Sequence, residues 1–199
     1  MEFAEVVRRR RMVRSYDPSR PIPRDQVSEL LRLAIRAPSA GHTQGWRFLV
    51  LDDITSCSTF WEATSEGEPD AWLTRMRSAP VLILCLSDKD AYLDRYAEPD
   101  KGWTDRDAAR WPVPYWDIDT GMASMILLLA AEEQGLGACF FGVPPDRWQA
   151  VRAAFAIPDR LGLVGVISLG YPAADLKSPS LKRGRRRMEE VTSFGTYSE

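Results

Sequence analysis

The segment 117–134 constrains the fold more than any other part of the chain. It is apolar almost all round, and Gly135, Leu136 and Gly137 follow it directly. A helical segment without a polar face predicts a helix that is buried on nearly every side. Glycine just after the last turn is typical of a helix C-terminus. We therefore expect a central helix that lies in the core or in a subunit interface.

Helical and strand-like patterns alternate along the rest of the chain. Apolar residues at helical spacing predict a helix over 24–36, and a continuous apolar run predicts a strand buried on both faces over 81–86. Further helices are expected at 2–11, 55–63, 70–77 and 145–155, and further strands at 46–51, 138–142 and 163–169. Two segments lack periodicity: the aromatic stretch 98–116, which predicts a lid loop, and a polar arm over 171–199.

Composition indicates one ordinary globular domain spanning residues 1–199. The chain has 45% hydrophobic and 27% charged residues, as in soluble folded proteins. It starts with neither a basic leader nor an apolar h-region, and no apolar run approaches the ~18 residues of a membrane span. This predicts a cytoplasmic protein with no membrane partner. Cys57, Cys85 and Cys139 form no C-x-x-C pair, which argues against a disulfide framework and a zinc site, so no metal is expected.

Two arginine clusters lie near opposite ends of a chain whose net charge is only -2. The first comprises residues 8–11 and Arg14, and the second comprises 182–183 and 185–187. Local positive charge in a nearly neutral chain indicates a site for one compact anion, and guanidinium groups bind phosphate through paired hydrogen bonds. The alternatives are a solvated face or a nucleic-acid-binding tail. The neutral net charge and the lack of a recognisable binding fold argue against nucleic acid.

Four motifs, in this order along essentially the whole chain, resemble the FMN-dependent nitroreductase family. They are R-R-M-V-R-S-Y at 10–16, A-P-S-A-G-H-T-Q-G-W at 37–46, G-L-G-A-C-F-F-G at 135–142 and R-G-R-R-R-M-E-E-V at 183–191, of which the second is the most specific. The resemblance implies an α+β fold with a mixed β-sheet flanked by helices. It also implies a homodimer with two FMN molecules at its interface, a long central interface helix, and a C-terminal arm that wraps the other subunit.

The resemblance further implies which residues contact the cofactor and the substrate. The implied cofactor residues are Arg10, Arg11, Met12, Arg14, Arg183 and Arg185 at the phosphate, Pro38, Ser39 and Ala40 along the flavin edge and ribityl chain, Gln44 from either subunit, and Phe141 and Gly142 near the reactive edge. Candidate substrate contacts are His42, Tyr115 and Trp116, because aromatic rings can stack on a flat acceptor. Met12 stands where the family usually has Ser, and Gly45 where Pro is common.

No catalytic acid, base or nucleophile is expected, because the flavin would carry the chemistry. His42 is the only histidine, and no G-x-S-x-G elbow accompanies a serine. The function implied is electron transfer from NAD(P)H through FMN to a nitroaromatic, quinone or similar flat small-molecule acceptor by a ping-pong route. The alternatives are other flavin chemistry on the same fold (reductive dehalogenation, dehydrogenation or flavin breakdown) and a non-enzymatic nucleic-acid-binding module.

Overall fold

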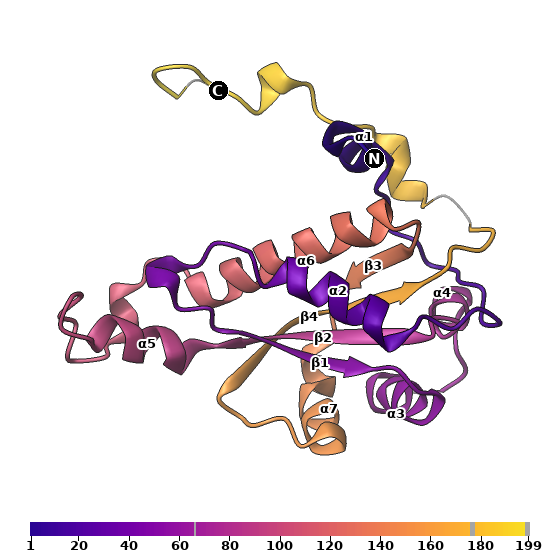
Figure 1. The fold of residues 1–199 in the computed structure, drawn as a ribbon, viewed down its shortest axis with the longest axis horizontal. Helices are drawn as coiled ribbons and strands as arrows, with labels where there is room; N and C mark the ends of the chain where they lie inside the picture. Colours follow the sequence, from indigo (N-terminus) through magenta and orange to yellow (C-terminus); the bar gives the residue numbers. More distant parts are fainter. Residues whose placement is uncertain (66, 176–177, 198–199) are drawn as a thin grey trace.

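A four-stranded antiparallel sheet forms the middle layer of the protein, and helices cover both of its faces (Figure 1). The computed structural model describes residues 1–65, 67–175 and 178–197. The strands, in their order across the sheet, are β1 (Trp46–Leu51), β2 (Val81–Asp88), β4 (Leu161–Gly170) and β3 (Gly137–Phe141). Every neighbouring pair of strands is antiparallel.

The helices form an outer layer on each side of the sheet. On one face lie α2 (Arg24–Ala34) and α6 (Tyr115–Glu133), and on the other lie α3 (Ile54–Thr64) and α7 (Trp148–Phe155) (Figure 1). Three further helices are α1 (Phe3–Arg9), α4 (Ala71–Met76) and α5 (Lys89–Ala97). Short 3-10 turns occur at Ala40–His42, Ala108–Arg110, Pro145–Arg147, Pro179–Arg183 and Met188–Glu190.

The strand β2 is buried along its whole length, as its apolar run predicts. Because successive side chains of a strand point to opposite faces, its residues divide between the two cores. Ile83 and Cys85 pack with α2 and α6, whereas Leu82 and Leu84 pack with α3 and α7. Each fully buried aliphatic side chain contributes about 1.5–3 kcal/mol relative to exposure. The apolar run therefore holds both helical layers on one sheet.

The helix α6 is central, as expected, but one of its stripes is exposed. Ala123, Leu127 and Ala131 are buried, whereas Ile118, Met122 and Met125 are 37%, 43% and 41% exposed. These three residues share one face, because residues three and four apart lie above one another on a helix. Gly135 ends the helix with a positive φ of 73°. Among the described residues, no helix combines the length and the hydropathy needed to span a membrane.

The structure confirms the α+β class and corrects the sequence prediction in three places. The pairing of the strands is antiparallel rather than mixed, and the parallel contact is an isolated bridge between Met12 and Ala138. The helix α5 was not expected; Asp88 caps it by accepting the N–H of Ala91. Tyr115 and Trp116 were placed in the loop 98–116 but form the first turn of α6, where the preceding proline is no obstacle because first-turn N–H groups need no partner within the helix.

The C-terminal segment leaves the body of the protein, as the prediction of an arm implies. Residues 179–191 are exposed throughout, and Figure 1 shows this segment, in yellow, extending away from the sheet and its helices. Leu181, Met188 and Val191 are among its exposed apolar side chains. Exposed apolar side chains within an otherwise polar segment are typical of a surface that lies against another molecule.

Candidate functional site

The loop of residues 39–45 has an unusual backbone. Gly41, His42 and Gln44 have φ values of 61°, 55° and 55°. For residues other than glycine, this left-handed conformation costs about 1–2 kcal/mol per residue and persists only where the surroundings enforce it. Within the loop, the Ser39 hydroxyl accepts the N–H of Gln44 at 3.0 Å, and the Thr43 hydroxyl donates to the carbonyl of Ala40 at 2.6 Å.

The helices α5 and α6 hold this loop in place. Asp119 of α6 accepts the N–H of Ala40 at 2.8 Å and the hydroxyl of Tyr92 at 2.7 Å, both at Oδ2. Arg95 of α5 donates to the carbonyl of Gly41 at 2.9 Å. Burial raises the pKa of Tyr92 well above its ordinary value, and the hydrogen bond to Asp119 adds to this effect. Tyr92 therefore remains a protonated donor at neutral pH.

Two glycines let tyrosine rings of α5 approach the loop. A Cβ atom at Gly45 would overlap the ring of Tyr92, and a Cβ at Gly41 would lie 2.8 Å from Cε2 of Tyr96. Gly45 is the position at which the family commonly has proline, and proline also carries a Cβ. The departure from the family pattern is therefore explained by the ring of Tyr92.

The residues expected to form a lid pack as one aromatic cluster on α5. Trp111 is at its centre, and its indole N–H is buried with no hydrogen-bond partner among the described residues. Ring centroids lie at 4.5 Å from Trp111 for Tyr96, 5.6 Å for Trp103, 5.7 Å for Tyr115, 6.0 Å for Tyr92 and 6.1 Å for Trp116. The segment 98–114 is therefore anchored to α5, and we call these six side chains the aromatic cluster.

The arginine motif of residues 10–14 runs beside the edge strand β3. The N–H of Val13 donates to the carbonyl of Ala138 at 2.9 Å, and the sulfur of Met12 accepts the N–H of Phe140 at 3.4 Å. The side chain of Met12 therefore packs into the core and would offer a ligand no hydrogen-bond donor. This agrees with the loss of a serine contact expected from the sequence.

The arginine side chains of this motif are poorly satisfied. Nη1 of Arg10 is buried and lacks a hydrogen-bond partner, Arg11 is exposed, and Nη1 of Arg14 donates to the carbonyl of Met12 at 3.1 Å. No ion pair joins any of the three to a carboxylate within the described ranges. A buried donor without an acceptor costs about 1–3 kcal/mol, and a phosphate oxygen would remove that cost. The motif therefore fits a phosphate-bearing cofactor.

One carboxylate limits how that phosphate could bind. Asp175 accepts the backbone N–H of Arg14 at 2.9 Å through Oδ2, and its Oδ1 is buried without a hydrogen-bond partner among the residues that the structure describes. That N–H is therefore not free for a ligand. The guanidinium groups of Arg10, Arg11 and Arg14 remain the available donors at this end of the protein.

The other expected cofactor residues differ in what they can offer. The ring of Phe141 stacks on Trp61 with centroids 5.6 Å apart and an interplanar angle of 11°. Gly142 is exposed and has open space where a side chain would be. The expected contact of this pair through the backbone is consistent with both observations. Arg183 and Arg185 are exposed in the C-terminal segment. Pro38 and His42 are also exposed, at the loop.

The expected cofactor residues lie at opposite ends of α6 within one chain. Asp119 binds the loop of residues 39–45, whereas Glu132 pairs with Arg9 beside the arginine motif at 3.2 Å. At a rise of about 1.5 Å per residue, the two acidic residues lie roughly 20 Å apart along the helix. We call these regions the loop half (residues 39–45 with Asp119, α5 and the aromatic cluster) and the arginine half (residues 10–14 with the adjoining end of β3).

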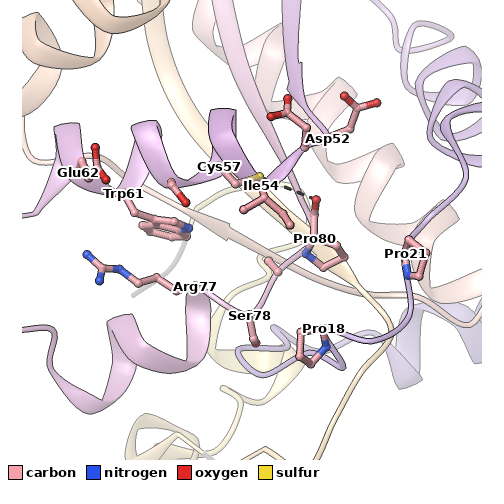
Figure 2. Close-up of a pocket in the computed structure, with 13 residues that line it drawn as sticks. Pro18, Pro21, Asp52, Ile54, Cys57, Trp61, Glu62, Arg77, Ser78 and Pro80 are labelled. Carbon is pink, nitrogen blue, oxygen red and sulfur yellow. Dashed lines mark hydrogen bonds between the residues drawn. The ribbon is translucent and has the colours of Figure 1, made fainter.

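A cavity of about 440 Å³ lies elsewhere, beyond the end of β1 (Figure 2). Asp52, Ile54, Cys57, Trp61 and Pro80 are among its lining residues, and none of the expected cofactor residues lines it. The Cys57 thiol contacts the carbonyl of Pro80 at 3.8 Å, and burial raises its pKa to about 11, so it is a poor nucleophile. This cavity is therefore not the candidate cofactor site.

Asp119, Tyr92 and Arg95 hold the loop and were missed by the sequence analysis. Asp119 is only 3% exposed, and an acidic residue on the buried face of a helix is a usable signal for a functional or bracing role. Tyr92 lies in a segment to which no element was assigned. In the described residues, no group of three His, Cys, Asp or Glu side chains could hold a metal ion, and the three cysteines are free and buried.

Comparison with known proteins identifies the family. Residues 7–171 match the family model described as Nitroreductase family. The chain belongs to the nitroreductase family. A relative from Archaeoglobus fulgidus, provisionally named an NADH dehydrogenase/NAD(P)H nitroreductase, is 29% identical over 175 residues and is matched over 86% of each chain. The resemblance seen in the sequence motifs is thereby confirmed.

Other nitroreductase relatives have names that denote different chemistry. An iodotyrosine deiodinase from Thermotoga neapolitana is 28% identical over 213 residues, with 97% of each chain matched. A 5,6-dimethylbenzimidazole synthase from Rhodospirillum rubrum is 29% identical over 178 residues, covering 82% of this chain and 79% of the relative. Membership of the family therefore does not fix the reaction.

Solved structures confirm the nitroreductase fold. A nitroreductase family protein from Clostridium difficile superposes with a TM-score of 0.74 at 24% identity, covering 99% of this chain and 100% of the other. A provisionally named nitroreductase from Desulfovibrio desulfuricans, solved in complex with FMN, superposes with a TM-score of 0.72 at 24% identity, covering 100% and 99%. At this identity the likeness establishes the fold and leaves the activity open.

Proposed function

We propose that this nitroreductase-family protein is an FMN-dependent oxidoreductase that passes electrons from NAD(P)H to a nitroaromatic, quinone or similarly flat acceptor. The observation that carries the proposal is the buried, unpartnered Nη1 of Arg10 in a motif whose other arginines also lack carboxylate partners. A phosphate group satisfies such a site. The FMN in the related Desulfovibrio desulfuricans structure supports FMN as the phosphate-bearing molecule of this proposal.

The residues of the chain would bind and orient this cofactor rather than act as acids or bases. Arg10, Arg11 and Arg14 would hold the phosphate, and the backbone of Phe141 and Gly142 would face the reactive edge. Ser39 keeps its hydroxyl proton available, since the hydroxyl only accepts within the loop. When bound, FMN would supply the two-electron redox chemistry that links a nicotinamide donor to the acceptor.

We further propose that the site is completed by a second copy of the chain. The loop half and the arginine half lie about 20 Å apart along α6 in one chain, whereas an antiparallel pair of α6 helices would place them together. The exposed stripe of Ile118, Met122 and Met125 on α6 supports this pairing. The arm of residues 171–199 would then lie on the other subunit and bring Arg183 and Arg185 toward its phosphate site.

Subunit complementation tests this arrangement. One variant carries Arg10→Ala and Arg14→Ala, and a second carries Ser39→Ala and Gln44→Ala. Each homodimer should lose flavin. A mixed dimer, isolated through two different tags, should regain one intact site and therefore about half of the wild-type flavin content. A mixed dimer without flavin would mean that both halves of each site come from the same chain, and it would overturn the shared-site proposal.

The visible spectrum under anaerobic conditions tests the activity. Flavin absorption bands that bleach on addition of NADH or NADPH, and recover with a quinone or nitroaromatic, would support the proposed reaction and identify its donor. Initial rates with both substrates varied should give the parallel lines of a ping-pong route. A colourless protein that also takes up no added FMN would overturn the proposal.

The second candidate function is other flavin chemistry on the same fold. Similarity to an iodotyrosine deiodinase and to a 5,6-dimethylbenzimidazole synthase favours reductive dehalogenation or flavin breakdown. Dehydrogenation is a third possible reaction of this kind. A bound flavin that stays oxidised with both nicotinamides would select this alternative. The single domain over 1–199, the cytoplasmic location, the absence of a nucleic-acid partner and a substrate role for His42, Tyr115 and Trp116 remain predictions.

A further inference from the structure

Asp119 is a buried carboxylate whose polar partners come from two separate segments. Its Oδ2 accepts the N–H of Ala40 at 2.8 Å and the hydroxyl of Tyr92 at 2.7 Å. Asp119 is only 3% exposed. No cation pairs with it in the described part of the chain. A buried charge is tolerated where hydrogen bonds satisfy it, so both bonds are needed for this carboxylate to stay in place.

Tyr92 connects this carboxylate to the aromatic cluster. Its ring makes edge-on contacts with Trp111 and Trp116 at centroid distances of 6.0 Å and 6.4 Å. The same ring fills the space beside Gly45, where a Cβ atom would overlap it. Tyr92 thus touches the aromatic cluster with its ring, closes one end of the loop at Gly45, and reaches the other end through Asp119.

We propose that Tyr92 and Asp119 are positioning residues for the cofactor. Together they fix the left-handed backbone of residues 39–45 and tie it to the aromatic cluster through the two hydrogen bonds that Asp119 accepts. The pair touches neither the expected phosphate site nor the reacting atoms, so its role is to set where the loop presents Ser39 and Gln44. This inference rests on the proposed function, because it assigns the loop to a flavin.

The test compares three variants of Tyr92 and Asp119 with one control variant, and it adds Trp111→Ala, which removes the central ring of the aromatic cluster and should also raise exchange in the loop. Asp119→Leu deletes the acceptor, Tyr92→Phe deletes one donor, and Asp119→Asn removes the charge while keeping an oxygen that can accept both bonds. Tyr96→Phe is the matched control, because the hydroxyl of this neighbouring α5 tyrosine forms no hydrogen bond with the described residues. Hydrogen exchange of the peptide 39–45 in the cofactor-free protein is the first readout, and it is independent of flavin.

We expect exchange in this peptide to rise about tenfold in Tyr92→Phe, which loses one buried hydrogen bond, and by more than about tenfold in Asp119→Leu, which loses two. Asp119→Asn and Tyr96→Phe should stay near wild type. In the FMN-loaded protein, the first two variants should weaken FMN binding by about tenfold and change the visible circular dichroism of the flavin. A purely structural role would lower the melting temperature without changing the flavin spectrum.

Three results would overturn the proposal. Unchanged loop exchange in Tyr92→Phe would show that the pair does not hold the loop. This variant keeps the test decisive if Asp119→Leu fails to fold. Equal damage from Asp119→Asn and Asp119→Leu would assign the effect to charge. Unchanged loop exchange in Trp111→Ala would remove the link to the aromatic cluster. If the wild type takes up no FMN, the proposed function fails. The exchange measurements would still show whether Tyr92 and Asp119 hold the loop.

Discussion

The two ends of α6 differ in how completely one chain satisfies its own polar groups. At the loop half, Asp119, Tyr92 and Arg95 hold residues 39–45 by hydrogen bonds of 2.7–2.9 Å. At the arginine half, Arg10 has a buried nitrogen with no partner and Arg11 is exposed. The loop half is therefore preorganised by the fold, whereas the arginine half has donors that an anion could satisfy.

This difference indicates a division of labour within the proposed site. Preorganised groups orient a ligand with little loss of conformational entropy, whereas unpaired guanidinium groups supply most of the affinity for a phosphate. Changes at the arginine half should therefore affect cofactor affinity with little effect on folding. Changes at the loop half should affect the geometry of the bound cofactor and the stability of the loop together.

Removing Arg10 and Arg14 together should have the largest effect. Each hydrogen bond to a charged group contributes about 1.5–3 kcal/mol, so the Kd for FMN should rise at least about 100-fold. The melting temperature of the cofactor-free protein should change little. Titration of FMN followed by fluorescence quenching measures the affinity. Arg8→Ala is the control, because this exposed side chain bonds only the carbonyl of Ala4; equal losses in both proteins would contradict the assignment.

A charge on the exposed stripe of α6 should weaken the proposed dimer. Met122 is 43% exposed in one chain. Met122→Glu should therefore change the free energy of unfolding of a single chain by no more than about 0.5 kcal/mol. Dimerisation would bury that charge twice, and the dimer Kd should rise at least about 10-fold. Analytical ultracentrifugation over a concentration series measures it. An unchanged Kd would place the interface on another face.

Two glycine substitutions compare the halves directly. A Cβ at Gly45 would overlap Tyr92, and a Cβ at Gly137 would lie 2.8 Å from Cγ1 of Val13. Each alanine variant should lose about 1–3 kcal/mol of unfolding free energy, since neighbours must move to make room. Gly137→Ala should weaken FMN binding more, because Val13 lies between Met12 and Arg14. Urea unfolding and FMN titration on both variants check this, and a reversed order of affinities would contradict it.

An exposed ion pair should give the smallest effect. Arg24 donates to both carboxylate oxygens of Asp52, at 2.6 Å and 2.8 Å, and these hydrogen bonds lower the pKa of Asp52. A lowered folded-state pKa stabilises the protein above the ordinary carboxyl pKa, and this contribution fades as the pH falls through the folded value. Asp52→Asn should therefore cost about 0.5 kcal/mol or less at pH 7, because solvent screens the pair. Thermal unfolding at pH 7 and in progressively more acidic buffers should show this difference shrink once the pH falls below the ordinary carboxyl pKa.

Elements with strong periodicity were predictable from the sequence. The run of residues 81–86 and the apolar stretch 117–134 gave β2 and α6 because burial on all sides leaves a clear pattern. The helix α5 was not expected, because only Tyr92 and Leu93 are buried in it and so short an apolar pattern does not indicate a helix face. Tyr115 and Trp116 were assigned to a loop because neighbouring prolines hide the start of α6.

The candidate site was predictable as a set of motifs and not as an arrangement. The motifs supplied Arg10, Arg14, Ser39 and Gln44, but nothing in their spacing indicated that one helix separates the arginine half from the loop half. Asp119 and Tyr92 lie outside every motif, since their importance comes from a contact between distant segments. Likewise, the reason for Gly45 is a tyrosine ring from another element.

Local patterns in the sequence were enough to identify the family, the α+β class and the central helix, and they predicted the residues that would bind a phosphate. These properties depend on local patterns: hydrophobic periodicity, clustered charge and short motifs. Only the tertiary structure decided that β2 serves two cores, that Met12 packs inward, and that Asp119 and Tyr92 hold the loop. These are properties of contacts between residues far apart in the chain, and such contacts are fixed by packing rather than by sequence neighbours.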